Sequence, residues 1–200
     1  MYRKRLVFMV VLGLAIATVA PVPAHAFDSG AGFPAIGKKF QIKNLGNDKC
    51  VSVSPDFRGA YIGYADCSAE DVLQQFRIEK GPRLKEQEHL DEDDPALNIL
   101  RTAVDKSPGI PDLATFYCLY SNGLDDTAVY RSKCYGYPDG QWLYKKSEKL
   151  IFGGVAGVEL RRGCWRADKW GPNQGGGPKV RVVECKADDT AQQWQVDPLD

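Results

Sequence analysis

Apolar and polar residues alternate over short stretches of this chain, and turn-forming residues separate the stretches. The alternation is clear in Phe40-Gln41-Ile42-Lys43, at Val51 and Val53, and in Val180-Arg181-Val182. A period of two places successive side chains on opposite faces of a β-strand. After the first 26 residues no stretch sustains the apolar stripe of a helix beyond about two turns, and Gly and Pro are frequent. The pattern predicts an all-β fold of many short strands.

The first 26 residues follow a different pattern. Three basic residues (3–5) precede an apolar run (6–20), which is shorter than the stretch of about 20 residues that a membrane helix needs. Two prolines and the tripeptide Ala24-His25-Ala26 follow, and small residues at both ends of a tripeptide are typical of a signal-peptide cleavage site. We therefore predict a secretory signal peptide (1–26) cleaved after Ala26, no membrane span, and an extracellular mature protein. The alternative, an uncleaved membrane anchor, gives the prolines and the tripeptide no role.

Composition narrows the choice of partners. The chain has 26 Lys and Arg against 26 Asp and Glu, so it has no surplus of positive charge to neutralise phosphates. This balance argues against a nucleic-acid partner and against attraction to lipid by a polybasic segment. A hydrophobic content of 44% is ordinary for a globular chain.

The cysteines indicate disulfide bonds. All six lie beyond the predicted signal peptide, and an even number in an exported chain is typical of a disulfide set. They are Cys50, Cys67, Cys118, Cys134, Cys164 and Cys185. Consecutive cysteines form pairs of similar spacing and local sequence, which predicts three bridges in sequence order. A zinc site is the weaker alternative, because zinc ligands normally lie two to four residues apart and these cysteines do not.

Alignment on the cysteine pairs reveals a threefold internal repeat. In each copy the second cysteine is followed, at nearly the same distance, by a Gln-x-aromatic triplet or its remnant. The residues of this structural motif are Gln74, Phe76, Trp142, Gln192 and Trp194. The second copy has Gly140 where the others have the glutamine, and Gln141 stands next to its ring.

Three copies of about 45 residues with paired cysteines and a closing Gln-x-aromatic triplet resemble the ricin B-type (R-type) lectin repeat of the β-trefoil family. The resemblance implies a single β-trefoil domain (38–198) after an N-terminal tail (27–37), with repeats at about 38–80, 96–148 and 149–198. It also implies that the three rings share one core near a pseudo-threefold axis, where large aromatic side chains contribute most buried area.

An acidic insertion (81–95) lengthens the connection between the first two repeats. It contains Lys85-Glu86-Gln87-Glu88 and Asp91-Glu92-Asp93-Asp94. We interpret it as a solvated loop. A calcium site would need regularly spaced acids and a turn glycine, which this segment lacks.

The resemblance also implies where a sugar would bind. The family holds an Asp two residues after the first cysteine, an aromatic shortly before the second, and an Asn before the Gln. At the Asp position the three copies here have Ser52, Tyr120 and Arg166. At the aromatic position they have Ala65, Ser132 and Val183, and at the Asn position they have Leu73, Asp139 and Ala191. No copy keeps the set. Tyr64 lies one residue from the aromatic position, and such a shift turns a strand side chain to the opposite face.

Other polar and aromatic residues offer a site in place of these. In the third copy Trp165, Asp168, Trp170, Asn173 and Gln174 precede the glycine-rich turn at 175–178, and in the second copy Tyr135, Tyr137 and Asp139 form a similar group. Rings beside carboxylates and amides suit a carbohydrate site and equally a protein-binding hot spot. The ligand-binding residues we predict are Asp168, Trp170, Asn173, Gln174, Tyr135, Tyr137 and Asp139. Packing in the core is the alternative for Trp165 and Trp170, and more so for Trp165, which directly follows a cysteine.

Little in the sequence supports catalysis. His89 is the one histidine beyond the predicted signal peptide and lies in the acidic insertion, and bridged cysteines cannot act as nucleophiles. No glycine motif for phosphate binding is present, and paired carboxylates for glycoside hydrolysis cannot be recognised from spacing alone. We predict a protein that is not an enzyme and uses no cofactor and no metal.

The predicted function is that of a secreted, non-catalytic, lectin-like β-trefoil that recognises surface or polymeric glycans. The alternative is a ricin-like trefoil with decayed sugar sites that acts as a protein-binding or toxin-assembly subunit, similar to the accessory subunits of cytolethal distending toxins. The partner is then a carbohydrate in the first case and a protein of a secreted assembly in the second.

Overall fold

The computed structural model describes residues 32–53, 62–81, 98–103, 117–121, 127–134, 140–153, 163–168 and 179–199. The predicted signal peptide and all but the first residue of the acidic insertion lie outside these ranges, so both stay predictions.

The described residues form twelve β-strands in three groups of four, which confirms the all-β prediction. The first group is β1 (Lys39–Asn44), β2 (Cys50–Val53), β3 (Ile62–Ala65) and β4 (Phe76–Lys80). The second is β5 (Asn98–Thr102), β6 (Tyr117–Ser121), β7 (Thr127–Lys133) and β8 (Trp142–Lys145). The third is β9 (Leu150–Gly153), β10 (Gly163–Asp168), β11 (Lys179–Glu184) and β12 (Trp194–Leu199). Short 3-10 turns, η1 (Val72–Gln74) and η5 (Thr190–Gln192), precede β4 and β12.

The outer strands of the three groups close into a barrel. Strand β1 pairs with β4 and β12, β4 pairs with β5, and β8 pairs with β9, all antiparallel. An isolated bridge between Ile99 and Gln141 joins β5 to the start of β8, and the Trp194 amide donates to the Lys149 carbonyl at 2.7 Å to join β12 to β9. Closure pairs strands that would otherwise be exposed sheet edges.

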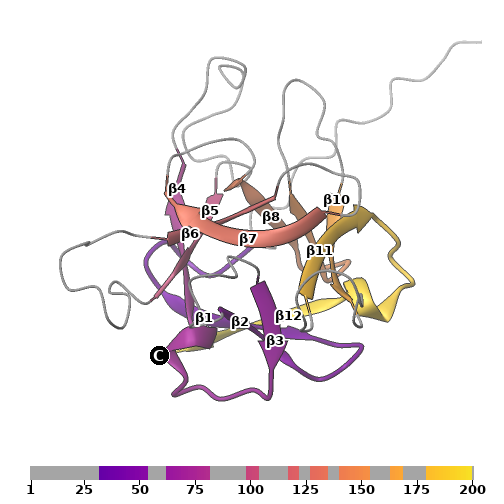
Figure 1. Cartoon of the computed structure of the whole chain (residues 1–200), viewed down its shortest axis with the longest axis horizontal. Coiled ribbons are helices and arrows are strands. Elements are labelled where there is room, and N and C mark those ends of the chain that lie inside the picture. Colours follow the sequence, from indigo (N-terminus) through magenta and orange to yellow (C-terminus); the bar gives the residue numbers. More distant parts are fainter. Residues whose placement is uncertain are drawn as a thin grey trace, which may run out of the picture.

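The inner strands of each group form hairpins that meet around a common axis. The hairpins are β2–β3, β6–β7 and β10–β11. Their second strands contact one another, β11 with β7 and β3, and β3 with β7. Figure 1 shows β3, β7 and β11 converging from three sides. Each hairpin can therefore present an outer face to solvent while its inner face covers the core.

Aromatic side chains fill the core where the three groups meet. Phe76, Trp142 and Trp194 are fully buried, as the resemblance implied. Trp165 is also fully buried, with its ring centroid 5.1 Å from that of Trp142 and 6.0 Å from that of Trp194, both edge to face. Such contacts add to the burial energy of the rings. Trp165 is therefore a core residue, the alternative named for it above.

The segment before β1 also contributes to the core. Phe33 packs against Phe40 and Tyr144, with ring centroids 5.6 Å apart in both pairs. Gly37 follows with a φ of 80°, in the left-handed region that favours glycine, and its amide donates to the Ile78 carbonyl at 3.1 Å. Part of the predicted tail is thus tied to the barrel.

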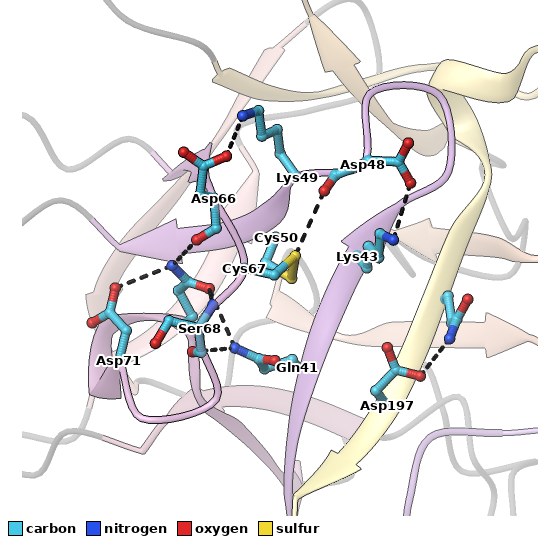
Figure 2. The surroundings of a disulfide bond; sticks show 12 residues. Gln41, Lys43, Asp48, Lys49, Cys50, Asp66, Cys67, Ser68, Asp71 and Asp197 are labelled. Atoms are coloured by element: carbon cyan, nitrogen blue, oxygen red, sulfur yellow. Dashed lines mark hydrogen bonds and ion pairs between the residues drawn. A yellow bond between two sulfur atoms is a disulfide. The ribbon is translucent and has the colours of Figure 1, made fainter.

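The three disulfides join the cysteines in sequence order, as predicted: Cys50–Cys67, Cys118–Cys134 and Cys164–Cys185. In each bridge the first cysteine lies on the first strand of a hairpin, and the second cysteine lies one or two residues beyond the end of the second strand. Figure 2 shows the first bridge beneath the β1–β2 turn. Among the described residues, no helix has the length and apolar character needed to cross a membrane.

Candidate functional site

The motif glutamine holds the turn that follows the second cysteine. Gln74 Nε2 donates to the Asp66 carbonyl at 2.8 Å, and its Oε1 accepts from the Ser68 amide at 3.0 Å. Gln192 does the same in the third repeat, with the Glu184 carbonyl at 3.0 Å and the Lys186 amide at 2.9 Å. Both side chains are buried. The glutamine therefore satisfies buried backbone groups and is structural.

An aspartate three residues before each of these glutamines caps the 3-10 turn. Asp71 Oδ1 accepts from the Leu73 amide and Asp189 Oδ1 accepts from the Ala191 amide, both at 3.0 Å. The Asp71 amide also donates to the Ser68 carbonyl at 3.2 Å, and Figure 2 shows these two residues close together. The sequence analysis missed this role, although the repeated Asp-x-x-Gln spacing is a capping signal that could have revealed it.

The second repeat replaces the glutamine with a tyrosine from another strand. A Cβ on Gly140 would lie 2.5 Å from Cε1 of Tyr120, whose side chain is only 2% exposed. The ring of Tyr120 thus fills the volume into which a side chain at position 140 would project. Gln141, fully buried, is the counterpart of Gln75 and Gln193, which directly precede the rings of the other repeats.

The family's Asp position, two residues after the first cysteine, lies on the first strand of each hairpin. There it is directly opposite a residue of the second strand. These cross-strand pairs are Ser52 with Gly63, Tyr120 with Tyr130, and Arg166 with Arg181. The same place therefore carries small, aromatic and cationic side chains in turn, and in none of the three does it carry a carboxylate.

In the second repeat this place is an aromatic cluster. The ring centroids of Tyr120 and Tyr130 are 6.0 Å apart, and Tyr120 packs with Ile99 and the Cys118–Cys134 bridge. Beside it the Arg131 guanidinium lies 5.4 Å from the ring centroid of Tyr117. Burial lowers the pKa of Arg131 from its usual value, and the Tyr117 hydroxyl partly offsets this.

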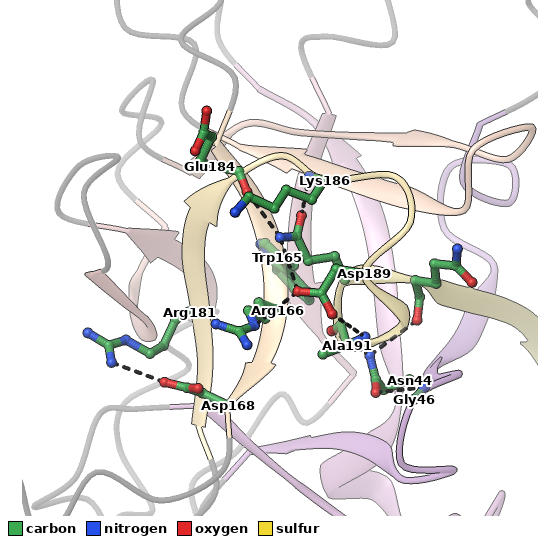
Figure 3. Close-up of polar contacts among 12 residues, drawn as sticks. Asn44, Gly46, Trp165, Arg166, Asp168, Arg181, Glu184, Lys186, Asp189 and Ala191 are labelled. Carbon is green, nitrogen blue, oxygen red and sulfur yellow. Dashed lines mark hydrogen bonds and ion pairs between the residues drawn. The ribbon is translucent and has the colours of Figure 1, made fainter.

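In the third repeat the same place is occupied by two ion pairs. Arg166 Nε lies 3.2 Å from Asp189 Oδ2, and Arg181 Nη1 donates to Asp168 Oδ2 at 3.0 Å (Figure 3). The side chains are half-exposed, at 43% for Arg166 and 30% for Arg181. Partial exposure lowers the stabilisation that such pairs give. Their more definite effect is to hold four charged groups in fixed positions on one face.

Tyr64 connects this hairpin to the first repeat. Its ring packs on the core and its hydroxyl donates to the Asp168 carbonyl at 2.9 Å. The side chain points inward, away from the family's sugar position, as the one-residue shift predicted. Burial raises the pKa of Tyr64 above its usual value and the Asp168 carboxylate raises it further, while a hydrogen bond with Asn47 lowers it.

Of the ligand-binding residues predicted above, the structure describes Asp168. It lies at the end of β10 with its carboxylate on Arg181, a partner that the sequence analysis did not name. The remaining six predicted residues fall outside the described ranges: Trp170, Asn173, Gln174, Tyr135, Tyr137 and Asp139. Within the ranges that are described, no group of three His, Cys, Asp or Glu side chains is arranged to hold a metal ion.

No family model and no curated protein sequence matches the chain, but solved structures do. ThreeFoil, a designed 3-fold symmetric protein, is similar with a TM-score of 0.53 and 16% identity, over 80% of this chain and 99% of that one. The C-terminal domain of an earthworm lectin, a mutant in complex with 6'-sialyllactose, has a TM-score of 0.50 and 13% identity, over 81% and 99% of the two chains.

GalNAc-T7, crystallised with UDP, GalNAc and Mn2+, is similar with a TM-score of 0.52 and 15% identity. The match covers 82% of this chain but only 23% of GalNAc-T7, so it concerns one part of that larger protein. Identities this low carry the fold alone. Together with the closed barrel, the three hairpins and the three disulfides, these likenesses show that the chain has an all-β, β-trefoil fold with three pseudo-equivalent, cysteine-paired repeats.

Proposed function

We propose that this protein is a secreted, non-catalytic, lectin-like β-trefoil that binds a surface or polymeric glycan through the outer face of its β10–β11 hairpin. The observation that carries the proposal is the Asp168–Arg181 ion pair, a half-buried carboxylate and guanidinium held together at 3.0 Å where the hairpin opens into its loop. The family's own sugar positions do not carry it, because none of them keeps the family's residues.

The ion pair suits the recognition of sugar hydroxyls. Arg181 contacts the Oδ2 atom of Asp168, and a carboxylate can accept hydrogen bonds at both of its oxygens. The guanidinium supplies donors in a planar fork. Since each group fixes the rotamer of the other, a ligand would not have to order them, which lowers the entropic cost of binding.

The segment that follows contains further residues suited to sugar binding. Asp168 and Lys179 are cross-strand neighbours, so both ends of the ten residues 169–178 are anchored beside the ion pair. That loop contains Trp170, Asn173 and Gln174, a ring to cover an apolar sugar face and two amides for its hydroxyls. The proposal requires that these residues and Asp168 lie close enough to contact the same sugar.

Two further observations support the proposal. The earthworm lectin domain, which is similar over nearly its whole length, was crystallised with a sialylated sugar. The three disulfides suit an oxidising, extracellular compartment. No catalytic step belongs to the proposal, since the one histidine beyond the predicted signal peptide, His89, lies in the acidic insertion.

The test is a glycan array probed with the oxidised chain from Phe27 to Asp200 and with the variants Asp168→Asn and Trp170→Ala. Binding by the parent chain and its loss in both variants is the expected result. The matched control is Asp66→Asn, which removes an exposed carboxylate paired with Lys49 in the first repeat and should leave binding unchanged. A folded chain that binds no glycan would overturn the proposal.

A second function is favoured by the second repeat. Tyr130, which is partly exposed and packs on the buried Tyr120, puts an aromatic ring at the place where the family binds sugar, and tyrosines are common in protein-binding hot spots. The chain would then be a protein-binding or toxin-assembly subunit with decayed sugar sites. Loss of co-purification with a defined secreted partner in Tyr130→Ala, together with an empty glycan array, would establish this alternative.

A further inference from the structure

Two arginines face each other across the β10–β11 hairpin, on the surface to which the proposed function assigns the glycan. Arg166 on β10 and Arg181 on β11 are in direct register. Like charges directly opposite each other on a sheet repel, and here a carboxylate lies beside each arginine. The fold does not require the two arginines, because the corresponding pairs in the other repeats are Ser52 with Gly63 and Tyr120 with Tyr130. An arrangement without which the other two repeats fold points to a role in binding.

The alternation of the strands puts both guanidiniums on the outer face. Trp165 and Ala167 on β10, and Val180 and Val182 on β11, are buried toward the core. Since successive residues of a strand point to opposite faces, Arg166 and Arg181 point away from the core. Figure 3 shows them on the neighbouring strands of the hairpin, each beside its own aspartate.

The two carboxylates hold the arginines from opposite ends of the pair. Asp168 lies toward the hairpin loop and binds Arg181, whereas Asp189 caps η5 beyond the other end of β11 and binds Arg166. Asp189 contacts Arg166 through Nε, the nitrogen nearest the stem of the side chain. This contact is an ion pair without a hydrogen bond at Nε, and 43% of the Arg166 side chain is exposed, so a ligand can reach it.

Cationic side chains gather on this face. Lys179 is the cross-strand neighbour of Asp168 and belongs to the same outer face as Arg166 and Arg181. Among the described residues, these three cations lie with the carboxylates Asp168 and Asp189. Cations gathered on one face can attract an anionic group to it.

We propose that the Arg166–Arg181 pair binds the acidic group of a glycan, so that the preferred ligand of this protein is an acidic polysaccharide. Planar guanidiniums bind carboxylate and sulfate oxygens with two parallel hydrogen bonds, and two of them in register can clamp one such group. The inference rests on the proposed function, because it names the chemical class of the glycan bound at that same hairpin.

The experiment measures the binding of polygalacturonate, dextran sulfate and neutral dextran to the oxidised chain at low and moderate salt. We expect the acidic polymers to bind at least about tenfold more tightly than dextran, and the preference to weaken as salt screens the charges. Polygalacturonate offers only carboxylates and dextran sulfate only sulfates, so their ranking identifies the acidic group. Neutral dextran has the same backbone as dextran sulfate but carries no charge, so it is the uncharged control.

Four variants separate recognition from charge. Arg166→Gln and Arg181→Gln should each lower affinity for the acidic polymer by about tenfold or more, and Arg181→Lys, which keeps the charge but not the planar fork, should lose most of it. Lys145→Gln removes one positive charge from an exposed ion pair of the second repeat and should bind as the parent does. Circular dichroism and thermal unfolding establish that each variant is folded.

The outcomes distinguish this inference from the proposed function. If the glycan array contains hits but none is acidic, the inference is wrong and the proposed function stands. If neither the array nor the polymers bind, both fail. If acidic polymers bind but Arg166→Gln and Arg181→Gln bind as tightly as the parent, or Lys145→Gln is as weak as they are, the arginine pair is not the site.

Discussion

Trp142 and Gly153 are cross-strand neighbours on β8 and β9, and the tryptophan ring lies over the glycine so closely that a Cβ on Gly153 would be 1.8 Å from Cζ3 of the indole. In the first repeat the motif ring is the smaller Phe76, and its cross-strand neighbour is Thr102, which has a full side chain. Between these two repeats, the size of the ring and the size of its neighbour compensate, as close packing favours. In the third repeat Trp194 lies opposite Asn44, so a tryptophan at this place does not always face a glycine.

Gly153→Ala should therefore be strongly destabilising. The added methyl group meets a fully buried ring, and such overpacking costs about 1–3 kcal/mol and occasionally more. Chemical denaturation with urea measures the loss in the free energy of unfolding. Gly32→Ala is the matched control, because a Cβ on Gly32 meets nothing within 4 Å, and it should change stability by less than about 0.5 kcal/mol.

The shorter ring of phenylalanine should relieve this clash. The atoms nearest the added Cβ are Cζ3, Cε3 and Cη2, all on the outer edge of the indole. We expect the double variant Trp142→Phe, Gly153→Ala to be more stable than the sum of the two single losses predicts. Strict additivity in this double-mutant cycle would show that the two residues do not compete for the same space.

The buried tryptophans differ in the hydrogen bonds of their indole nitrogens. Trp194 Nε1 donates to the Trp165 carbonyl at 2.9 Å, whereas Trp165 Nε1 has no hydrogen-bond partner among the described residues. Trp194→Phe leaves a buried carbonyl unsatisfied, while Trp165→Phe removes a buried unsatisfied donor. Since both changes remove the same volume, we expect Trp194→Phe to cost about 1–2 kcal/mol more. Equal losses in urea denaturation would contradict this explanation.

The second repeat cannot accept the glutamine that its two counterparts contain. Gly140→Gln should destabilise the fold by about 2 kcal/mol or more, because its Cβ meets the ring of Tyr120. The double variant Gly140→Gln, Tyr120→Ser copies the first repeat, where Ser52 occupies the equivalent position, and should recover part of the loss. Thermal unfolding of the single and double variants checks this. No recovery would mean that the backbone of the second repeat has itself changed.

The sequence predicted those parts of the fold that are specified by local, repeated signals. The cysteine pairs and the closing rings recur at similar spacing in all three repeats and the motif glutamine recurs in two, and the structure pairs the cysteines and buries the rings as expected. The filling of the Gly140 position by Tyr120 was not predicted, because it joins residues from different strands and appears in one repeat alone. A contact that occurs in only one repeat leaves no repeated pattern in the sequence from which it could be predicted.

The candidate site was predicted less completely for a related reason. Asp168 was identified by its residue type, but its partner Arg181 depends on the register of the β10–β11 hairpin. Register follows from where the chain turns, and the sequence between the two strands offers several turns among its glycines and prolines. The capping role of Asp189, in contrast, was available from the Asp-x-x-Gln spacing. A local signal was overlooked there, whereas the register had to come from the structure.

Two tyrosines, the buried Tyr144 and the partly buried Tyr64, should make the protein less stable in alkaline solution. Burial raises the pKa of Tyr144, and the Asp197 carboxylate raises it further. Burial likewise raises the pKa of Tyr64, and the Asp168 carboxylate adds to this. Their hydroxyls donate to the carbonyls of Trp194 and Asp168, at 3.1 Å and 2.9 Å. Each phenol therefore keeps its proton in the folded protein at a pH where the unfolded chain, with a tyrosine pKa of 10.0, loses it.

The direction of the effect follows from proton binding. Above pH 10.0, the usual pKa of tyrosine, the folded state binds more protons than the unfolded state, so the free energy of unfolding falls as the pH rises toward the folded pKa values. Below that range both states hold the protons and these tyrosines contribute no pH dependence. Urea denaturation across this alkaline range should show a shallower decline in Tyr144→Phe and in Tyr64→Phe than in the parent. The parent and the two variants share every other titratable group, and the bridged cysteines do not titrate. Parallel declines in the parent and both variants would show that the phenols ionise without cost in the folded protein.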